Sequence, residues 1–178
     1  MKLRIALTSS LALALATFAV LGHHASADGR ETTLHATLRG LNQVPPVKTA
    51  ATGTLRATYD EARRQIRFTL EYRNLATNPT MAHIHFGPTK VNGGIAAFFC
   101  GGGNQPACPA TTSGKITGTI TVANIVAIRT QGIAAGDFAG LSLAIRTGNA
   151  YVNVHNETFV DGEIRGQIEG LGRGGQDD

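Results

Sequence analysis

Residues 65–72 read QIRFTLEY, and apolar and polar side chains alternate along them. Ile66, Phe68 and Leu70 fall on one side of an extended chain, and the polar residues between them fall on the other. A period of two is typical of a β-strand with one buried face. This stretch therefore predicts a β-fold, and the rest of the chain can be compared with it.

The neighbouring segments repeat the pattern. Residues 52–59 form a candidate partner strand, joined to 65–72 by the polar turn at 60–64. Residues 34–39 alternate in the same way, and the prolines at 45–46 follow them. Short strands separated by turns are typical of a sandwich or barrel. Further candidate strands are 81–86, 94–99, 114–121, 151–155 and 163–169.

One segment departs from the β pattern. Asp137 can cap a short helix that carries Phe138, Leu141 and Ile145 and ends at Gly148. The same segment could instead form another strand. The sequence thus predicts an all-β domain with at most one short helix.

The N-terminal segment has the layout of a cleaved secretory signal. Lys2 and Arg4 precede a mostly apolar run at 5–20, and small residues occupy 25–27. We expect cleavage after Ala27 and export to the periplasm or the exterior, with an uncleaved anchor as the alternative. The apolar run is short for a transmembrane helix, and no later stretch is apolar enough to span a bilayer.

The predicted domain organisation has three parts. Residues 1–27 are the signal peptide, 28–169 one β-domain, and 170–178 a glycine-rich, charged tail that we expect to be disordered. Loss of the two basic residues with the signal lowers the net charge from +4 to +2. The remaining basic residues are scattered and aromatic residues are few, which argues against a nucleic-acid partner.

The only two cysteines bracket a glycine-rich loop. Cys100 and Cys108 flank residues 101–107. In an oxidising compartment, two such thiols are expected to form a disulfide bond. A thiolate metal site is the alternative, but it lacks the close Cys-x-x-Cys spacing.

Three stretches together resemble the chordin (CHRD) domain. They are LRGLNQVPPV at 38–47, AHIHFG at 82–87, and GNAYVNVH at 148–155, which is followed by GEIRGQ at 162–167. They occur in the order of that family and span nearly all of the expected mature chain. The loop NETFVD at 156–161 departs from the family pattern, which has a Thr and later a Pro there.

The resemblance implies an extracellular or envelope β-sandwich with immunoglobulin-like layering. Chordin itself is a secreted antagonist of growth factors, so an extracellular protein partner is one implication. Single exported bacterial domains of this family have mostly unassigned roles. A family likeness therefore indicates the fold better than the activity.

Three histidines are the candidate metal ligands. His83 and His85 are two residues apart in a strand, so both side chains leave the same face, which Met81 shares. His155 ends another strand and shares its face with Asn153. Three imidazoles suit copper or zinc, and a nearby thioether sulfur would favour Cu(I). The alternative is that these histidines are structural and hydrogen-bond to backbone groups.

Two charged residues of the last strand could support that site. Glu163 and Arg165 share a face, and either could orient His155 or Asn153. An ordinary cross-strand ion pair between the two is the alternative.

Three functions remain open at this point. The first is a non-enzymatic module that binds copper or a similar metal. The second is a copper-dependent enzyme resembling superoxide dismutase, because the His-x-His pair with a later histidine is similar to the copper half of that enzyme. The third is a metal-free adhesion or scaffold domain. Ser113 and Ser142 lack a nucleophile motif, so no catalytic residue is assigned.

Overall fold

The computed structural model describes residues 31–171 of the chain. The predicted signal peptide and its cleavage site lie outside the described residues, as does most of the predicted tail. Leu171, which we placed in that tail, is instead only 8% exposed and belongs to the hydrophobic core. The folded domain thus extends past the predicted boundary at Glu169.

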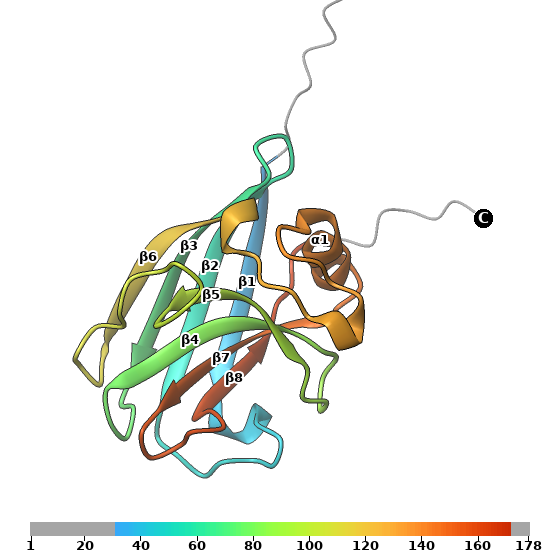
Figure 1. Ribbon diagram of the computed structural model, residues 1–178. Helices are drawn as coiled ribbons and strands as arrows, with labels where there is room; N and C mark the ends of the chain where they lie inside the picture. The colour runs from blue at the N-terminus through green and yellow to red at the C-terminus, as the bar shows by residue number, and fades with distance from the viewer. Residues whose placement is uncertain (1–30, 172–178) are drawn as a thin grey trace, which may run out of the picture.

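Eight antiparallel strands form a single sheet in the order β5-β4-β7-β8-β1-β2-β3-β6. Figure 1 shows β4, β7 and β8 crossing in front of β1, β2 and β3. The edge strands β5 and β6 lie next to each other, so the sheet nearly closes into a barrel. The strands are β1 (Thr32–Arg39), β2 (Thr52–Asp60), β3 (Gln65–Arg73), β4 (Pro79–Phe86), β5 (Gly94–Cys100), β6 (Gly114–Thr121), β7 (Ala150–Asn156) and β8 (Ile164–Gln167).

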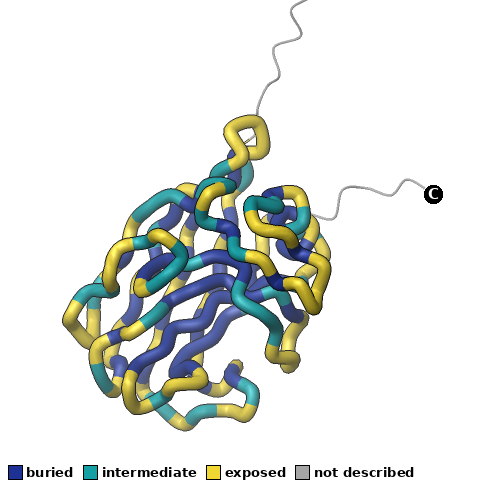
Figure 2. The backbone as a smooth tube through the Cα atoms, in the orientation of Figure 1, coloured by how far each residue is buried: buried dark blue, intermediate teal, exposed yellow. Residues whose placement is uncertain are grey.

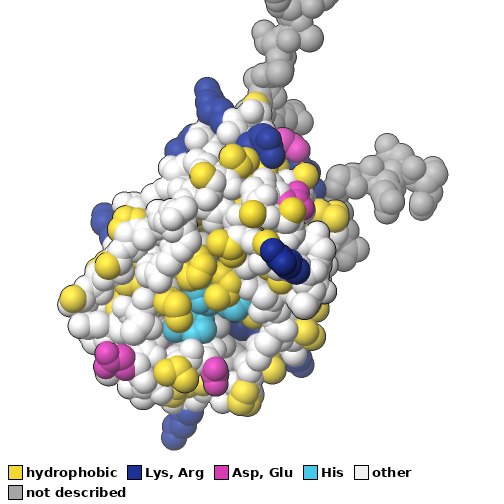
Figure 3. All heavy atoms as spheres, in the orientation of Figure 1, with side chains coloured by type: hydrophobic (Ala, Val, Ile, Leu, Met, Phe, Trp, Pro, Cys, Tyr) yellow, Lys and Arg dark blue, Asp and Glu magenta, His cyan; other side chains and the backbone are white. Residues whose placement is uncertain are grey.

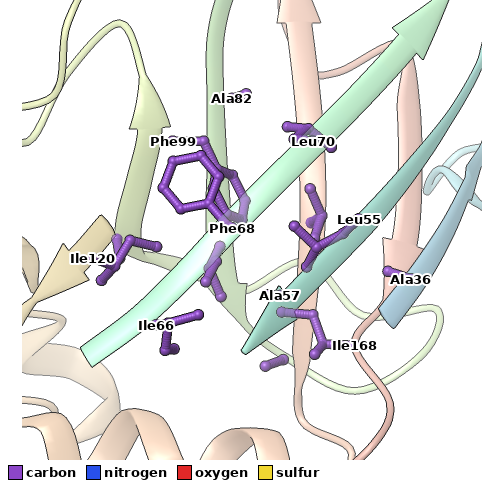
Figure 4. Close-up of a cluster of buried hydrophobic side chains, with 14 of the residues drawn as sticks. Ala36, Leu55, Ala57, Ile66, Phe68, Leu70, Ala82, Phe99, Ile120 and Ile168 are labelled. Carbon is purple, nitrogen blue, oxygen red and sulfur yellow. The ribbon is translucent and has the colours of Figure 1, made fainter. Parts of the chain in front are cut away.

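The core lies between the two halves of this sheet. Along β3 every second side chain is buried, as the alternation in the sequence predicts. Phe68 of β3 meets Phe99 of β5 edge to face at 4.7 Å between ring centroids, and this contact joins the two halves (Figure 4). Burying one such ring contributes about 1.5–3 kcal/mol.

The two halves are joined by sparse pairing between β8 and β1. Arg39 pairs with Arg165, and beyond the end of β8 an isolated bridge joins His35 to Glu169. The sheet bends at this joint, which brings its two halves face to face as layers. The all-β fold with one short helix is confirmed, and the layers of the expected sandwich belong to one continuous sheet.

The one α-helix within residues 31–171, α1 (Phe138–Arg146), begins where the sequence predicts. The Asp137 Oδ1 accepts a hydrogen bond from the Gly140 N–H at 2.8 Å, which caps the helix. Phe138 stacks on Tyr59 of β2 at 5.5 Å between centroids, so the helix closes one end of the core. Three short 3₁₀ turns are η1 (Gly40–Asn42), η2 (Val122–Asn124) and η3 (Arg129–Gln131).

The predicted disulfide is present. Cys100, the last residue of β5, is bonded to Cys108, and the bond closes the glycine-rich loop between them. A Cβ atom at Gly102 or Gly103 would lie only 2.5 Å from the Phe98 ring. The loop therefore needs glycine to lie flat on that ring, on the outer side of the sheet.

Strand β7 is unusual because all seven of its residues are buried. Val152 and Val154 point into the core, so the intervening residues must point to the outer face. Figure 2 shows this continuous buried strand beside β4, surrounded by exposed loops. Burial on the outer face is what sets the candidate site apart from the rest of the sheet.

Candidate metal centre

The three predicted histidines converge on the outer face of β4 and β7. His83 and His85 lie on β4, and His155 lies on the adjacent strand β7. The antiparallel register places Met81 opposite His155 and Asn153 opposite His83. His155 is therefore diagonal to His83, a position from which large side chains can touch.

The rings lie close together. The His83 ring centroid is 4.5 Å from that of His85 and 4.5 Å from that of His155, and His85 is 6.3 Å from His155. One ring nitrogen from each residue lies within 4.8 Å of the other two. Three nitrogens bound in a trigonal plane at about 2.0–2.1 Å from one ion would be about 3.5 Å apart, so small ring rotations suffice.

Backbone carbonyls fix the orientation of two of the rings. The His85 Nδ1 lies 2.8 Å from the Gly93 carbonyl oxygen, and the His155 Nδ1 lies 2.8 Å from that of Val160. A carbonyl can only accept, so each Nδ1 carries the proton and donates it. In a neutral imidazole the Nε2 atom then bears the lone pair, which is the form that binds a metal.

Gly93 reaches His85 because it has no side chain. A Cβ atom there would lie 1.8 Å from the carbonyl oxygen of Phe86, so only glycine allows the β4–β5 loop to fold back this closely. The Gly93 N–H also donates to the Tyr151 hydroxyl at 3.2 Å. The same residue thus orients one candidate ligand and the ring beside it.

The nitrogens that face the centre have no protein partner. Both ring nitrogens of His83 and the Nε2 atoms of His85 and His155 are buried, and no group within residues 31–171 hydrogen-bonds to them. Leaving a buried polar atom without a partner costs about 1–3 kcal/mol. These nitrogens are therefore free to accept a metal ion or a hydrogen bond.

The surroundings keep the imidazoles neutral. Burial, followed by repulsion from His85 and His155, lowers the pKa of His83 to about 2. Burial likewise lowers the pKa of His85 to about 4, although its bond to Gly93 opposes the shift. Burial also lowers the pKa of His155. At neutral pH all three rings are uncharged and able to coordinate a cation.

Aromatic rings enclose the cluster on two sides. Tyr151 stacks on His85 at 4.6 Å with an angle of 8° between the planes, and Phe98 meets His83 edge to face at 5.2 Å. The disulfide loop covers Phe98 from outside. Figure 3 shows histidine side chains at the surface of this face, beside a group of hydrophobic side chains.

Of the three residues predicted to support the cluster, one lies beside it and two form hydrogen bonds elsewhere. Met81 is opposite His155 in the register and half-buried, which places this residue beside the cluster. The Asn153 side chain instead accepts a hydrogen bond from the Gln43 Nε2 at 2.6 Å. Glu163 is fully buried and its carboxylate accepts from Thr49, Asn156 and the Ala76 N–H; none of its bonds within residues 31–171 reaches a histidine.

The ion pair considered between Glu163 and Arg165 is not formed. Glu163 precedes β8, and its carboxylate accepts hydrogen bonds from residues outside that strand. The Arg165 guanidinium instead lies over the Tyr151 ring, 3.4 Å from the ring centroid. Arg165, Tyr151 and His85 thus form a continuous stack. The sequence did not predict this stack. Strand alternation places Tyr151 on the face of His155 and Arg165 on the face of Glu163, but it does not show that Arg165 meets Tyr151.

No helix among the described residues is both long and apolar enough to cross a membrane. The fold and the cluster together define a small all-β domain with three buried imidazoles on the outer face of its sheet. Residues 34–168 match the family model for the CHRD domain, and the chain belongs to the CHRD domain family. No curated protein and no solved structure matches the chain.

Proposed function

We propose that this chain is an exported metal-binding module that holds copper through His83, His85 and His155. One observation carries the proposal. Three buried, neutral imidazoles bring nitrogens within 4.8 Å of one another, and the protein offers those nitrogens no hydrogen bond. Two of the rings are held by carbonyls in the tautomer that coordinates.

The donor set favours copper over zinc. Zinc in proteins takes four ligands, and the fourth is a further protein group or a water molecule. The cluster offers three nitrogens, and Met81, which is opposite His155 in the register, could add a thioether sulfur. Soft sulfur ligands select Cu(I), which also suits imidazole. Zinc remains the alternative metal in the experiment below.

The closed geometry favours binding over turnover. The ring nitrogens that face the centre have essentially no accessible surface. A copper enzyme that removes superoxide needs a coordination position that its substrate can reach. An ion bound by nitrogens with so little accessible surface would offer superoxide little room, so we favour a binding module over the enzyme that resembles superoxide dismutase.

Two observations support export. The first 27 residues have the layout of a signal peptide, and both cysteines are joined in a disulfide, a bond that persists in oxidising compartments. Periplasmic or secreted location is therefore part of the proposal.

The test is metal loading of the purified protein from Asp28 onward. Cu(I), Cu(II) and Zn(II) are added separately, and bound metal is measured after gel filtration by mass spectrometry. We expect one Cu(I) per chain, with less than a tenth of that in His83→Ala and in His155→Ala. The matched control is His35→Ala, because that ring is 58% exposed, pairs with Glu169 and is not part of the three-histidine cluster.

Three other outcomes would each point elsewhere. Equal uptake by parent and His83→Ala would place the ion at another site. Rapid loss of superoxide on addition of the copper-loaded protein would favour the enzyme. No uptake by the parent would refute the proposal and favour a metal-free scaffold, in which a water molecule could donate to the two Nε2 atoms.

A further inference from the structure

Arg165 is a buried cation without a carboxylate partner. It is 2% exposed, on strand β8. Its guanidinium donates to the carbonyl oxygens of Pro88 and Val91 at 2.9 Å and to the Asn92 Oδ1 at 3.1 Å. None of these three acceptors carries a formal charge.

Such a cation is costly to bury alone. Burial lowers the pKa of Arg165, and only its attraction to Tyr151 opposes this shift. Buried charges in proteins are normally paired with an opposite charge. Within residues 31–171 no acidic side chain bonds to Arg165, and its Nε–H and one Nη1–H find no acceptor. Each of these two N–H groups could donate a single hydrogen bond to a carboxylate oxygen.

Arg165 also lines a groove of about 520 Å³. One wall is the loop that begins with η1, and the other is the β4–β5 turn at Thr89 and Lys90. The two walls are tied together where the Asn92 side chain donates to the Val44 carbonyl at 3.0 Å. The volume suits a small molecule or the end of a peptide.

The lining of the groove is part apolar and part basic. Leu41, Val44 and Pro46 supply the apolar part, and Leu41 is 73% exposed, which is unusual for a large apolar side chain. Lys90 adds a second positive charge at the rim. The one acidic lining residue, Glu169, is paired with His35 at 3.1 Å.

We propose that this groove binds a carboxylate-bearing ligand with an apolar body. The carboxylate pairs with Arg165 and Lys90, and the apolar body lies against the side chains of the η1 loop. The ligand supplies the counter-ion that Arg165 lacks. This proposal is independent of the metal centre, because it needs no metal and uses none of the three histidines.

A free carboxylic acid and a peptide C-terminus share this chemistry. Octanoate and octanamide form one matched probe pair, and N-acetyl-Ala-Leu-Val with a free or an amidated C-terminus forms the other. Each probe is titrated into the metal-free, ¹⁵N-labelled full domain, and backbone amide and Arg Nε–H shifts are followed by NMR. We expect at least one acid to bind about tenfold or more tighter than its amide, with the Arg165 Nε–H shift moving on binding.

Lys90 provides a variant that spares the fold. Its φ of +65° is tolerated by Asn, so Lys90→Asn removes the charge without backbone strain. We expect affinity for the bound acid to fall about threefold to tenfold. Lys115→Gln is the control, because Lys115 is an exposed lysine on β6, outside the groove, and should leave affinity unchanged. Arg165→Gln should abolish the preference for acid over amide if the variant folds.

The proposal is overturned by any of three results. These are no saturable shift from either acid up to about 10 mM, equal affinity for acid and amide, and shifts that map away from Leu41, Lys90 and Arg165. Binding of octanoate alone indicates a free small acid, and binding of the peptide acid alone indicates a protein terminus as the natural source.

Discussion

Lowering the pH from 7 to 5 should destabilise the metal-free domain through its buried histidines. Burial lowers the pKa of His83 to about 2 and that of His85 to about 4, whereas in the unfolded chain both are near 6.5. Below pH 6.5 these imidazoles therefore bind protons in the unfolded chain but stay neutral in the folded chain. The free energy of unfolding must fall as the pH falls through this range.

The magnitude follows from the gap between the two states. A pH of 5 lies about 1.5 units below the pKa of an imidazole in the unfolded chain. Each imidazole that stays neutral in the fold therefore lowers the free energy of unfolding by about 2 kcal/mol. His83 and His85 together should lower the free energy of unfolding by about 4 kcal/mol. His155 shifts in the same direction and adds to the loss. A loss of this size is a large part of the 5–15 kcal/mol that holds a typical domain folded.

The assay is urea unfolding at pH 7, 6 and 5 in the presence of a chelator. Circular dichroism is the readout, because the chain has no tryptophan. His83→Leu replaces the most buried ring with an apolar side chain of similar size. Between pH 7 and 5, the free energy of unfolding of this variant should therefore fall by about 2 kcal/mol less than that of the parent. His35→Ala, which removes an exposed ring, should lose as much as the parent. If the parent unfolds at the same urea concentration at pH 7 and pH 5, the rings are not buried as described and the reasoning fails.

Three further predictions concern the parts that hold the site. Glu163→Gln should lower the free energy of unfolding by about 1–3 kcal/mol, because a fully buried carboxylate loses charged hydrogen bonds; urea unfolding at pH 7 measures it, and an unchanged midpoint would contradict the assigned contacts. Replacing both Cys100 and Cys108 by Ser should cost about 2–3 kcal/mol by opening a short loop, and a cost near zero would show that the loop is ordered without it. Asn156 begins a glycosylation sequon but is 1% exposed and donates to Glu163, so expression through a eukaryotic secretory route should add no glycan there; a mass increase at this residue would contradict its burial.

The fold was largely predictable because its strands have one buried face. Alternation along residues 65–72 identifies β3, and the Asp137 cap with Phe138 identifies α1, since both signals are local. The order of the strands in the sheet was not predictable, because the sequence of a strand does not determine which other strand pairs with it. The end of the domain was placed too early, because one apolar residue, Leu171, gives no periodic signal.

The three-histidine cluster was predictable from the sequence, but the groups that support it were not. His83 and His85 share a face by strand geometry, and only the register could show that His155 is diagonal to His83. The carbonyl groups that orient the rings belong to loops, where backbone direction depends on tertiary contacts. Arg165 was misassigned for the same reason, because its partners are backbone oxygens from the β4–β5 turn.

The choice between structural and metal-binding histidines turns on how each ring uses its two nitrogens. A structural histidine uses both ring nitrogens in hydrogen bonds. His85 and His155 instead each donate one N–H to a loop carbonyl, and the other nitrogen of each ring faces the cluster without a hydrogen-bond partner. His83 between them has no protein partner at either nitrogen. Packing alone would be served better by apolar side chains, which carry no cost of an unsatisfied polar atom. Three such rings within reach of one point therefore support the proposed cation site.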